Sequence, residues 1–319
     1  MSYFKKTIKI IIIVLYLEFT YSQSILDSIR NFGLNLDNLV FCNEFWLPTK
    51  EFPGLKEKLK SDVFGQPFVK NNLIPILEDY YLKANYKDSK NALVLSFHGP
   101  PGVGKSFVSE ILSVAPFIKN KHLFSANNIF FDKHLVDKHK ANINQLIDSS
   151  IRDCERSLFI FDDADYFPSE IFQELNVFRK IDGGLKYGGS VFIFLFQVGA
   201  EQLTALTLDL LRKGERREMF HIDEFHNIIK NAMLDKGYSG DSIFMKPINK
   251  IIPFLPLEKE HIKKCIDKGF VNEGYDITEN DYKKVYELLG FQSGTSFSSS
   301  GCKLALAKLS MGLNSKTEL

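Results

Sequence analysis

A run of glycines, prolines and one lysine at residues 99–106 has the residue types and spacing of a phosphate-binding loop. It fits G-x-x-x-x-G-K-[ST] at every position, directly after an apolar stretch, LVLSF, and before a helix-prone stretch, FVSEIL. Backbone N–H groups of such a loop wrap phosphate oxygens, its lysine meets the β and γ oxygens, and its hydroxyl is a ligand for Mg²⁺. The sequence therefore predicts a nucleoside triphosphate and Mg²⁺ site, formed by Gly99, Pro100, Pro101, Gly102, Val103, Gly104, Lys105 and Ser106.

Two carboxylates and an amide follow, each at the end of another apolar stretch. Phe159-Ile160-Phe161 ends in Asp162 and Asp163, and VFIFLF ends at Gln197. We expect Asp162 to hold the Mg²⁺ together with Ser106. Asp163 stands where a glutamate ordinarily polarises the attacking water, and Gln197 could touch that water or the γ-phosphate. Acidic residues after an apolar strand are common by chance, so this interpretation depends on their order and spacing behind a complete phosphate loop.

The elements that must position these residues follow an α/β pattern. The apolar runs at 93–97, 157–161 and 191–196 are too short for helices and suit strands buried on both faces of a parallel sheet. The segments between them have helical spacing. We predict a doubly wound α/β domain at 61–249, with a central parallel sheet flanked by helices. An N-terminal lead-in at 23–60 precedes it, and a small C-terminal helical lid domain at 250–315 follows it.

Length and charge bound the class of protein. A chain of 319 residues with 45% hydrophobic content can bury a large core and still carry a second, smaller domain. Its 40 basic and 39 acidic residues are scattered and leave a net charge of +1. Such a chain has no basic stripe of the kind that neutralises phosphates, which argues against a nucleic-acid partner.

Both ends of the sequence resemble targeting signals. Lysines, an apolar run from Ile10 to Leu17 and a small-residue site at 20–22 have the layout of a secretory signal peptide at 1–22. The last four residues, KTEL at 316–319, differ by one residue from the retrieval signal K-D-E-L. Retrieval has meaning only for a protein that entered the secretory route. The two signals together predict a protein retained in the lumen of the endoplasmic reticulum.

The four cysteines, Cys42, Cys154, Cys265 and Cys302, are an even number, which an oxidising compartment allows to pair in three ways. The sequence has no C-x-x-C, and His134 and His139 are distant from every cysteine, which argues against zinc. The spacing alone does not choose among the three connectivities.

Taken together, these segments resemble a known family, the torsins, which are AAA+ ATPases of the endoplasmic reticulum. The resemblance is carried by LVLSFHGPPGVGKSFVSEIL from Leu93, CERSLFIFDDAD from Cys154, FIFLFQVGAEQLT from Phe192, PFLPLEKEHIKKCI from Pro253 and GCK at 301–303. It extends from about Phe64 to Lys303, which is most of the chain without its signal peptide.

The resemblance implies several roles. Lys303 would be the sensor-2 residue, which reaches from the lid to the γ-phosphate and acts with Asp163 and Gln197. Torsin-like pairing would join Cys265 to Cys302 and Cys42 to Cys154. The nucleotide would be ATP, and the chain would form a homo-oligomer acting on protein substrates. Torsins lack their own arginine finger and borrow an arginine from the luminal domain of a membrane-bound activator. Arg212, Arg216 and Arg217 are therefore interpreted as solvated charges at a helix end.

Departures from the family pattern concern the chemistry directly. Torsins typically have Asn where this chain has Ser106, so Mg²⁺ ligation here should be conventional. The catalytic glutamate is shortened to Asp163, whereas the sensor-1 asparagine is lengthened to Gln197. We hypothesise that the two changes compensate and still position the attacking water. Because a misplacement of about 1 Å can cost two orders of magnitude in rate, we expect slow hydrolysis.

The leading interpretation is a luminal ATPase, activated by a partner, that remodels proteins or membranes of the endoplasmic reticulum and nuclear envelope. Its rival is a scaffold that binds ATP but hydrolyses little. A cytosolic kinase or GTPase conflicts with the signals at both ends.

Overall fold

The structure is a computed structural model that describes residues 52–83, 92–115, 118–126, 135–173, 175, 187–238, 250–270, 277–291 and 295–307. The predicted signal peptide, the KTEL end and Cys42 lie outside these ranges, so the Cys42–Cys154 pairing is not described.

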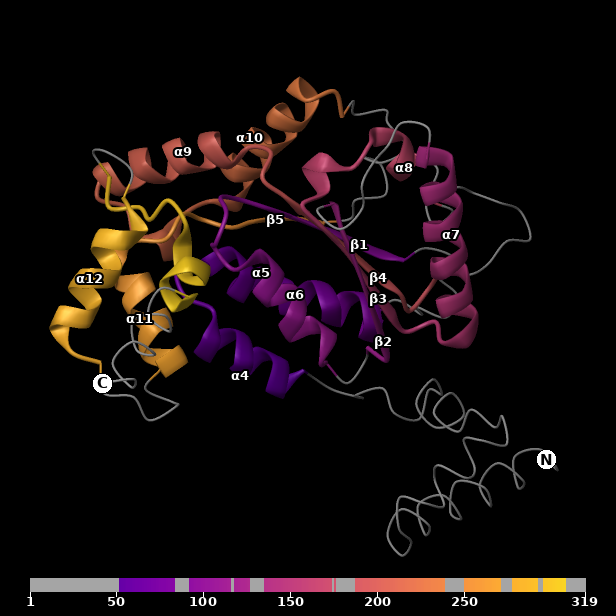
Figure 1. The fold of residues 1–319 in the computed structure, drawn as a ribbon, viewed down its shortest axis with the longest axis horizontal. Coiled ribbons are helices and arrows are strands. Elements are labelled where there is room, and N and C mark those ends of the chain that lie inside the picture. The colour runs from indigo at the N-terminus through magenta and orange to yellow at the C-terminus, as the bar shows by residue number, and fades with distance from the viewer. Residues whose placement is uncertain are drawn as a thin grey trace, which may run out of the picture. The chain divides into compact units, whose positions relative to one another are not determined.

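A five-stranded parallel sheet forms the centre of the molecule (Figure 1). The strands lie in the order β2-β3-β4-β1-β5, and every described pairing is parallel. Their bounds are Leu93–His98 for β1, Asn120–Ser125 for β2, Ser157–Asp162 for β3, Val191–Phe196 for β4 and Lys250–Pro253 for β5. The three apolar runs are thus the three central strands, as the sequence predicts. The phosphate loop follows β1, Asp162 is the last residue of β3, and Asp163 comes directly after it.

The two edge strands were not predicted. Both lie at an edge of the sheet, with a neighbouring strand on one side alone. The burial of β2 is mixed, and β5 has only four residues. β5 lies inside the range that the sequence analysis assigns to the lid, yet it pairs with β1 from Leu95 to His98.

Phenylalanines fill the core on one face of the sheet. Phe124, Phe161 and Phe194 occupy one register row across β2, β3 and β4, with ring centroids 4.8 Å apart at both steps. Phe172, from the helix α8 (Ser169–Gln173), packs edge-on against Phe194 at 5.3 Å. This aromatic row accounts for much of the phenylalanine content of the strands, and the packing of its rings stabilises the central sheet.

Helices cover both faces of the sheet (Figure 1). On one side lie α4 and α6, and on the other α7 to α10. The helices before the lid are α4 (Pro53–Asp62), α5 (Pro67–Glu78), π-helical η2 (Asp79–Lys83), α6 (Lys105–Ser113), α7 (Val136–Asp153), 3-10 helix η5 (Ala164–Tyr166), α8 (Ser169–Gln173), α9 (Ala200–Arg212), 3-10 helix η7 (Arg217–Met219) and α10 (Ile222–Asp235). The sequence-based expectation of a sheet flanked by helices is confirmed.

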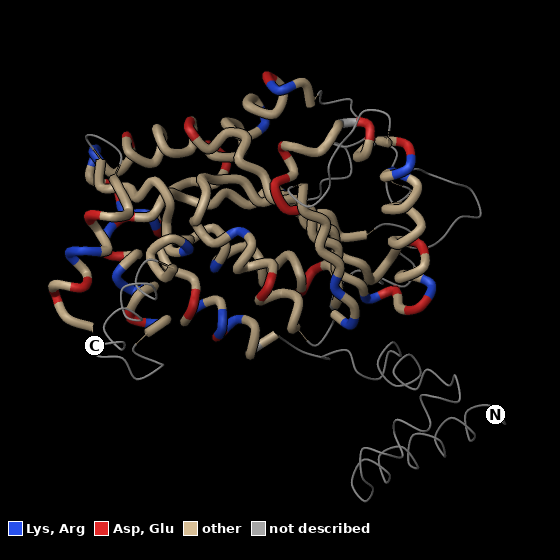
Figure 2. The backbone as a smooth tube through the Cα atoms, in the orientation of Figure 1, with Lys and Arg blue, Asp and Glu red and all other residues tan. Residues whose placement is uncertain are grey.

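A small helical lid follows β5. It consists of α11 (Lys259–Phe270), α12 (Glu279–Leu289), the segment 295–300 and a helix at 301–307. α12 starts with a capping box, in which Thr278 and Asp281 each bond the other's backbone N–H. Within the described residues, none of the helices is both long and apolar enough for a membrane span. Figure 2 shows acidic and basic residues interspersed along the outer helices.

Candidate active site

The phosphate loop connects β1 to α6, and its backbone has the conformation that only glycine adopts easily. Gly102 has φ +74° and Gly104 has φ +106°, both in the left-handed region. Gly104 is the N-cap of α6, which begins at Lys105. The free N–H groups and the positive end of the helix dipole therefore lie next to the loop, which is the arrangement of an anion site.

Lys105 is held over the start of this loop. Its ammonium group donates to the carbonyl oxygens of Gly99 at 2.6 Å and of Pro100 at 2.8 Å. Burial lowers the pKa of Lys105 to about 8, although the carboxylates of Asp165, Asp162 and Asp163 act in the opposite direction. A cation so poorly solvated is one that an incoming phosphate would stabilise strongly.

Ser106 and Asp162 provide oxygen ligands in the place where Mg²⁺ is expected. The hydroxyl of Ser106 lies 3.4 Å from both carboxylate oxygens of Asp162, although the two residues are 56 positions apart. Mg²⁺ prefers oxygen ligands and few protein groups, with water and phosphate completing the shell. The hydroxyl and carboxylate therefore fit this ion.

Asp163 and Gln197, the two positions at which this chain departs from the glutamate and asparagine of torsins, also contact each other. Asp163 has φ +53°, and its Oδ1 accepts from the Nε2 of Gln197 at 3.4 Å. Positive φ in a residue other than glycine stores strain, of a kind that clusters at functional sites. The arrangement brings carboxylate and amide together at the ends of β3 and β4, as the compensation hypothesis requires, while their catalytic role stays a prediction.

Two further polar residues hold this edge of the sheet, and their roles were not predicted from the sequence. Asp165 accepts from the backbone N–H groups of Gln197 and Val198, at 2.6 and 2.8 Å. His98, fully buried, lies with Nδ1 3.2 Å from the carbonyl oxygen of Val198 and Nε2 3.1 Å from the hydroxyl of Ser96. A carbonyl only accepts, so Nδ1 carries the proton and the neutral Nε2 accepts from Ser96.

His98→Gln is expected to make folding stability depend less on pH. Burial lowers the pKa of His98 from 6.5 to about 3. Below pH 6.5 the unfolded chain takes up a proton that the folded chain does not, so stability is full above 6.5 and falls by about 1.4 kcal/mol per pH unit toward 3. Urea unfolding between pH 6.5 and 4 should show a shallower slope in the variant. His221, which is exposed, supplies the control: His221→Gln should keep the wild-type slope. An unchanged slope in His98→Gln would contradict the buried neutral histidine.

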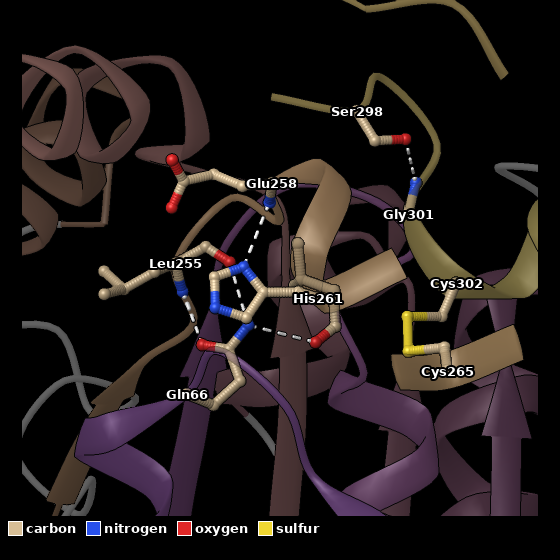
Figure 3. The surroundings of a disulfide bond; sticks show 9 residues. Gln66, Leu255, Glu258, His261, Cys265, Ser298, Gly301 and Cys302 are labelled. Atoms are coloured by element: carbon tan, nitrogen blue, oxygen red, sulfur yellow. Dashed lines mark hydrogen bonds between the residues drawn. A yellow bond between two sulfur atoms is a disulfide. The ribbon is translucent and has the colours of Figure 1, made fainter. Parts of the chain in front are cut away.

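The lid touches the phosphate loop directly. The N–H of Cys302 donates to the carbonyl oxygen of Gly102 at 3.1 Å. Cys302 forms a disulfide with Cys265 of α11, with Cα atoms 5.9 Å apart (Figure 3), which is the pairing that the resemblance implies. Lys303 is the next residue and its side chain is exposed. No contact of Lys303 with the loop is described, so its sensor-2 role stays a prediction.

A buried glutamine connects the phosphate loop to the segment that leads into the lid. The Nε2 of Gln66 donates to the carbonyl oxygens of Val103 and Leu255, at 3.2 and 2.8 Å, and its Oε1 accepts from the N–H of Leu255 at 2.7 Å. Figure 3 shows Gln66 facing Leu255 beside His261 of α11. The role of Gln66 could not be predicted from the sequence, because its partners lie 37 and 189 positions away.

The interpretation of Arg217 as a solvated charge is wrong. Its side chain is 5% exposed and pairs with Glu258 at 3.0 Å. It also donates to the carbonyl oxygens of Gly65 and Pro256 and lies 5.8 Å from the ring centroid of Phe297. Arg217 is thus committed to contacts within the chain. Arg212 and Arg216 are exposed, as expected.

A cavity of about 1050 Å³ opens beside the end of β4, where Gln197 lies. Its walls include Pro101 of the phosphate loop, Gln197, Thr204 of α9, Tyr238 and Thr295 of the lid. Asp165 also lines it. A group entering this cavity from outside could therefore approach the end of β4 from the side of α9.

Comparisons with known proteins agree with this architecture. A family model described as Torsin matches residues 39–161. A torsin-like protein of Drosophila melanogaster is 28% identical over 291 residues, covering 85% of this chain and 84% of its own length. A torsin-like protein of Caenorhabditis elegans is 29% identical over 263 residues, covering 77% and 73%. The predicted resemblance is confirmed.

Among solved structures, the S. cerevisiae Hsp104–ADP complex is similar with a TM-score of 0.58 and 13% identity. The match covers 91% of this chain but 50% of that one, so this chain spans half the length of that structure. At this identity the likeness concerns the fold alone, and it confirms the predicted AAA+ type of α/β architecture.

Proposed function

We propose that the chain, which is similar to torsin-like proteins over most of its length and has an AAA+ type of α/β fold, binds ATP with Mg²⁺ and hydrolyses it slowly to remodel proteins or membranes. The observation that carries this proposal is the meeting of a complete phosphate loop with Asp162, Asp163 and Gln197 at one edge of the sheet. The similar Hsp104 structure is a complex with ADP, which supports a nucleotide ligand for the shared fold.

Each side chain has one task in the proposed reaction. The loop from Gly99 to Ser106 binds the phosphates, and Lys105 neutralises charge on the β and γ oxygens. Ser106 and Asp162 hold Mg²⁺, which would offset negative charge on the phosphates when bound.

Asp163 orients the attacking water with the help of Gln197, and Lys303 approaches the γ-phosphate from the lid. Positioning and electrostatic stabilisation are the main contributions that a protein makes to phosphoryl transfer.

Turnover in Asp163 variants tests the proposal. We expect the purified protein to hydrolyse Mg-ATP slowly, Asp163→Asn to be at least about tenfold slower because its amide cannot accept a proton, and Asp163→Glu to retain activity. ATP binding, measured separately, should survive in all three proteins. A wild-type rate no higher than that of Asp163→Asn, with binding intact, would remove the compensation idea.

That outcome would favour the second candidate, an ATP-binding scaffold with little hydrolysis. The contact between Gln197 and Asp163 supports this scaffold candidate, because an amide bonded to the carboxylate competes with water for the same oxygen. Loss of ATP binding in the wild-type protein would exclude both candidates.

Partners follow from the same site. As the resemblance to torsins implies, the transition-state arginine is assigned to the luminal domain of a membrane-bound activator. Arg217 is committed to buried contacts within the chain. Homo-oligomerisation and protein substrates are further parts of the proposal.

Crosslinking and pull-down from microsomes with Asp163→Asn, which should trap the ATP-bound state, would identify activator and substrate together. Recovery of the same set of proteins with a variant that cannot bind ATP would count against an ATP-dependent partner.

The compartment is proposed to be the lumen of the endoplasmic reticulum and the nuclear envelope. The Cys265–Cys302 disulfide supports this assignment, because disulfides persist in oxidising compartments.

A further inference from the structure

We propose that Asp165 is a positioning residue that, together with His98, fixes the end of β4 so that Gln197 faces Asp163. This inference rests on the proposed ATPase function and deepens it. It assigns a task to a carboxylate that follows the metal-binding and water-orienting positions by only two or three residues.

Asp165 binds the backbone of the chain just beyond the point where the pairing of β3 with β4 ends. The described register between β3 and β4 ends at Phe161 and Phe194. Beyond that point the N–H groups of Gln197 and Val198 both point at Asp165, one to each carboxylate oxygen, at 2.6 and 2.8 Å. Charge-assisted bonds to two consecutive backbone donors fix both the place and the direction of the turn. The turn that carries the Gln197 side chain is therefore attached to the turn that carries Asp163.

His98 fixes the same turn from the other neighbouring strand. Its ring stacks on Phe196 at 5.0 Å and donates to the carbonyl oxygen of Val198, while Ser96 fixes the other ring nitrogen. Both backbone polar groups of Val198 are thereby held by side chains, one from β1 and one from η5. Gln197 lies directly before this clamped residue, so its backbone has little freedom to rotate the amide away.

The bonding of Asp165 favours positioning over direct catalysis. Both of its oxygens already accept short hydrogen bonds from backbone N–H groups, at 2.6 and 2.8 Å, whereas the bond from Gln197 to Asp163 is longer, at 3.4 Å. A carboxylate whose oxygens are engaged in this way is a poor candidate to orient a water molecule. The water-orienting role therefore stays with Asp163.

The test compares Asp165→Asn, Gln197→Ala and the double variant in single-turnover hydrolysis of Mg-ATP. Asparagine has one acceptor oxygen, and its NH₂ group faces a backbone donor, so one of the two bonds is lost. We expect the rate to fall about ten- to a hundredfold, with the ATP dissociation constant changed less than about threefold. Because Asp165 acts through Gln197, the double variant should be no slower than Gln197→Ala. Asp209→Asn, an exposed change on α9, is the control and should behave as wild type.

Hydrogen exchange provides a readout that does not need turnover. The Gln197 and Val198 amides should exchange about tenfold faster in Asp165→Asn, with exchange in the centre of β4 unchanged. Multiplicative losses in the double variant, or unchanged exchange of both amides, would overturn the inference. Absence of ATP hydrolysis in the wild-type protein would instead refute the proposed function, and the exchange result would still decide whether Asp165 holds the turn.

Discussion

Arg217→Met is expected to lower the free energy of unfolding by about 3–5 kcal/mol, the usual effect of removing one partner of a buried ion pair. Arg217 joins three parts of the chain, since it bonds Gly65 before α5, Pro256 after β5 and Glu258 at the start of the lid. Methionine fills similar space without donating. The substitution would leave one carboxylate and two carbonyl groups with fewer partners.

Urea unfolding under conditions that keep the disulfide intact measures this effect. Arg216→Met is the matched control, because Arg216 is the preceding residue and is exposed. It should change stability by less than about 0.5 kcal/mol. Arg217→Met combined with Glu258→Leu should regain part of the loss, since the unpaired carboxylate is then absent as well. A value for Arg217→Met close to that of the control would show that the contacts of Arg217 carry little of the stability.

Arg217 also shows where reasoning from sequence stops. It lies among charged neighbours, in RKGERRE, a stretch typical of an exposed helix end. Burial comes from residues about 40 and 152 positions away, which close around the guanidinium only in the folded chain. Asp165 and Gln66 are similar cases, because their partners are backbone groups of distant segments, and any residue type can supply a backbone group. The sequence carries no signal for such partners.

The central strands and the phosphate loop could be predicted because their determinants are local. Strands buried on both faces read as continuous apolar runs, and the loop needs its glycines at fixed spacing. Edge strands lack that signature, since water reaches part of their surface. β2 reads NKHLFS and β5 reads KIIP, and neither differs clearly from a loop next to a helix.

Gly301→Ala is expected to weaken ATP binding by about a hundredfold, because it would push the lid off the phosphate loop. Gly301 has φ +60°, and a Cβ at this position would lie 2.2 Å from the carbonyl oxygen of Gly102. The obstacle is backbone of the loop itself, which no rotamer change can move aside. Relief requires a shift of about 1 Å in the loop that binds the phosphates. Loss of two hydrogen bonds to the charged phosphates, at about 1.5 kcal/mol each, would weaken binding about a hundredfold. Equilibrium binding of ATP measures the loss.

Gly290→Ala separates this contact from backbone strain. Gly290 is also a lid glycine, with φ +63°, but the nearest atom to its Cβ would be the hydroxyl oxygen of Ser299 at 3.5 Å. Both substitutions place alanine at a positive φ, which costs about 1–3 kcal/mol, and only Gly301→Ala adds the collision. Equal ATP affinity in the two variants would mean that lid docking does not shape the nucleotide site. Lid docking would also place Lys303 near the γ-phosphate. Lys303→Ala should then weaken ATP binding in the wild-type background. It should have little further effect in Gly301→Ala, because the displaced lid no longer brings the lysine to the phosphate.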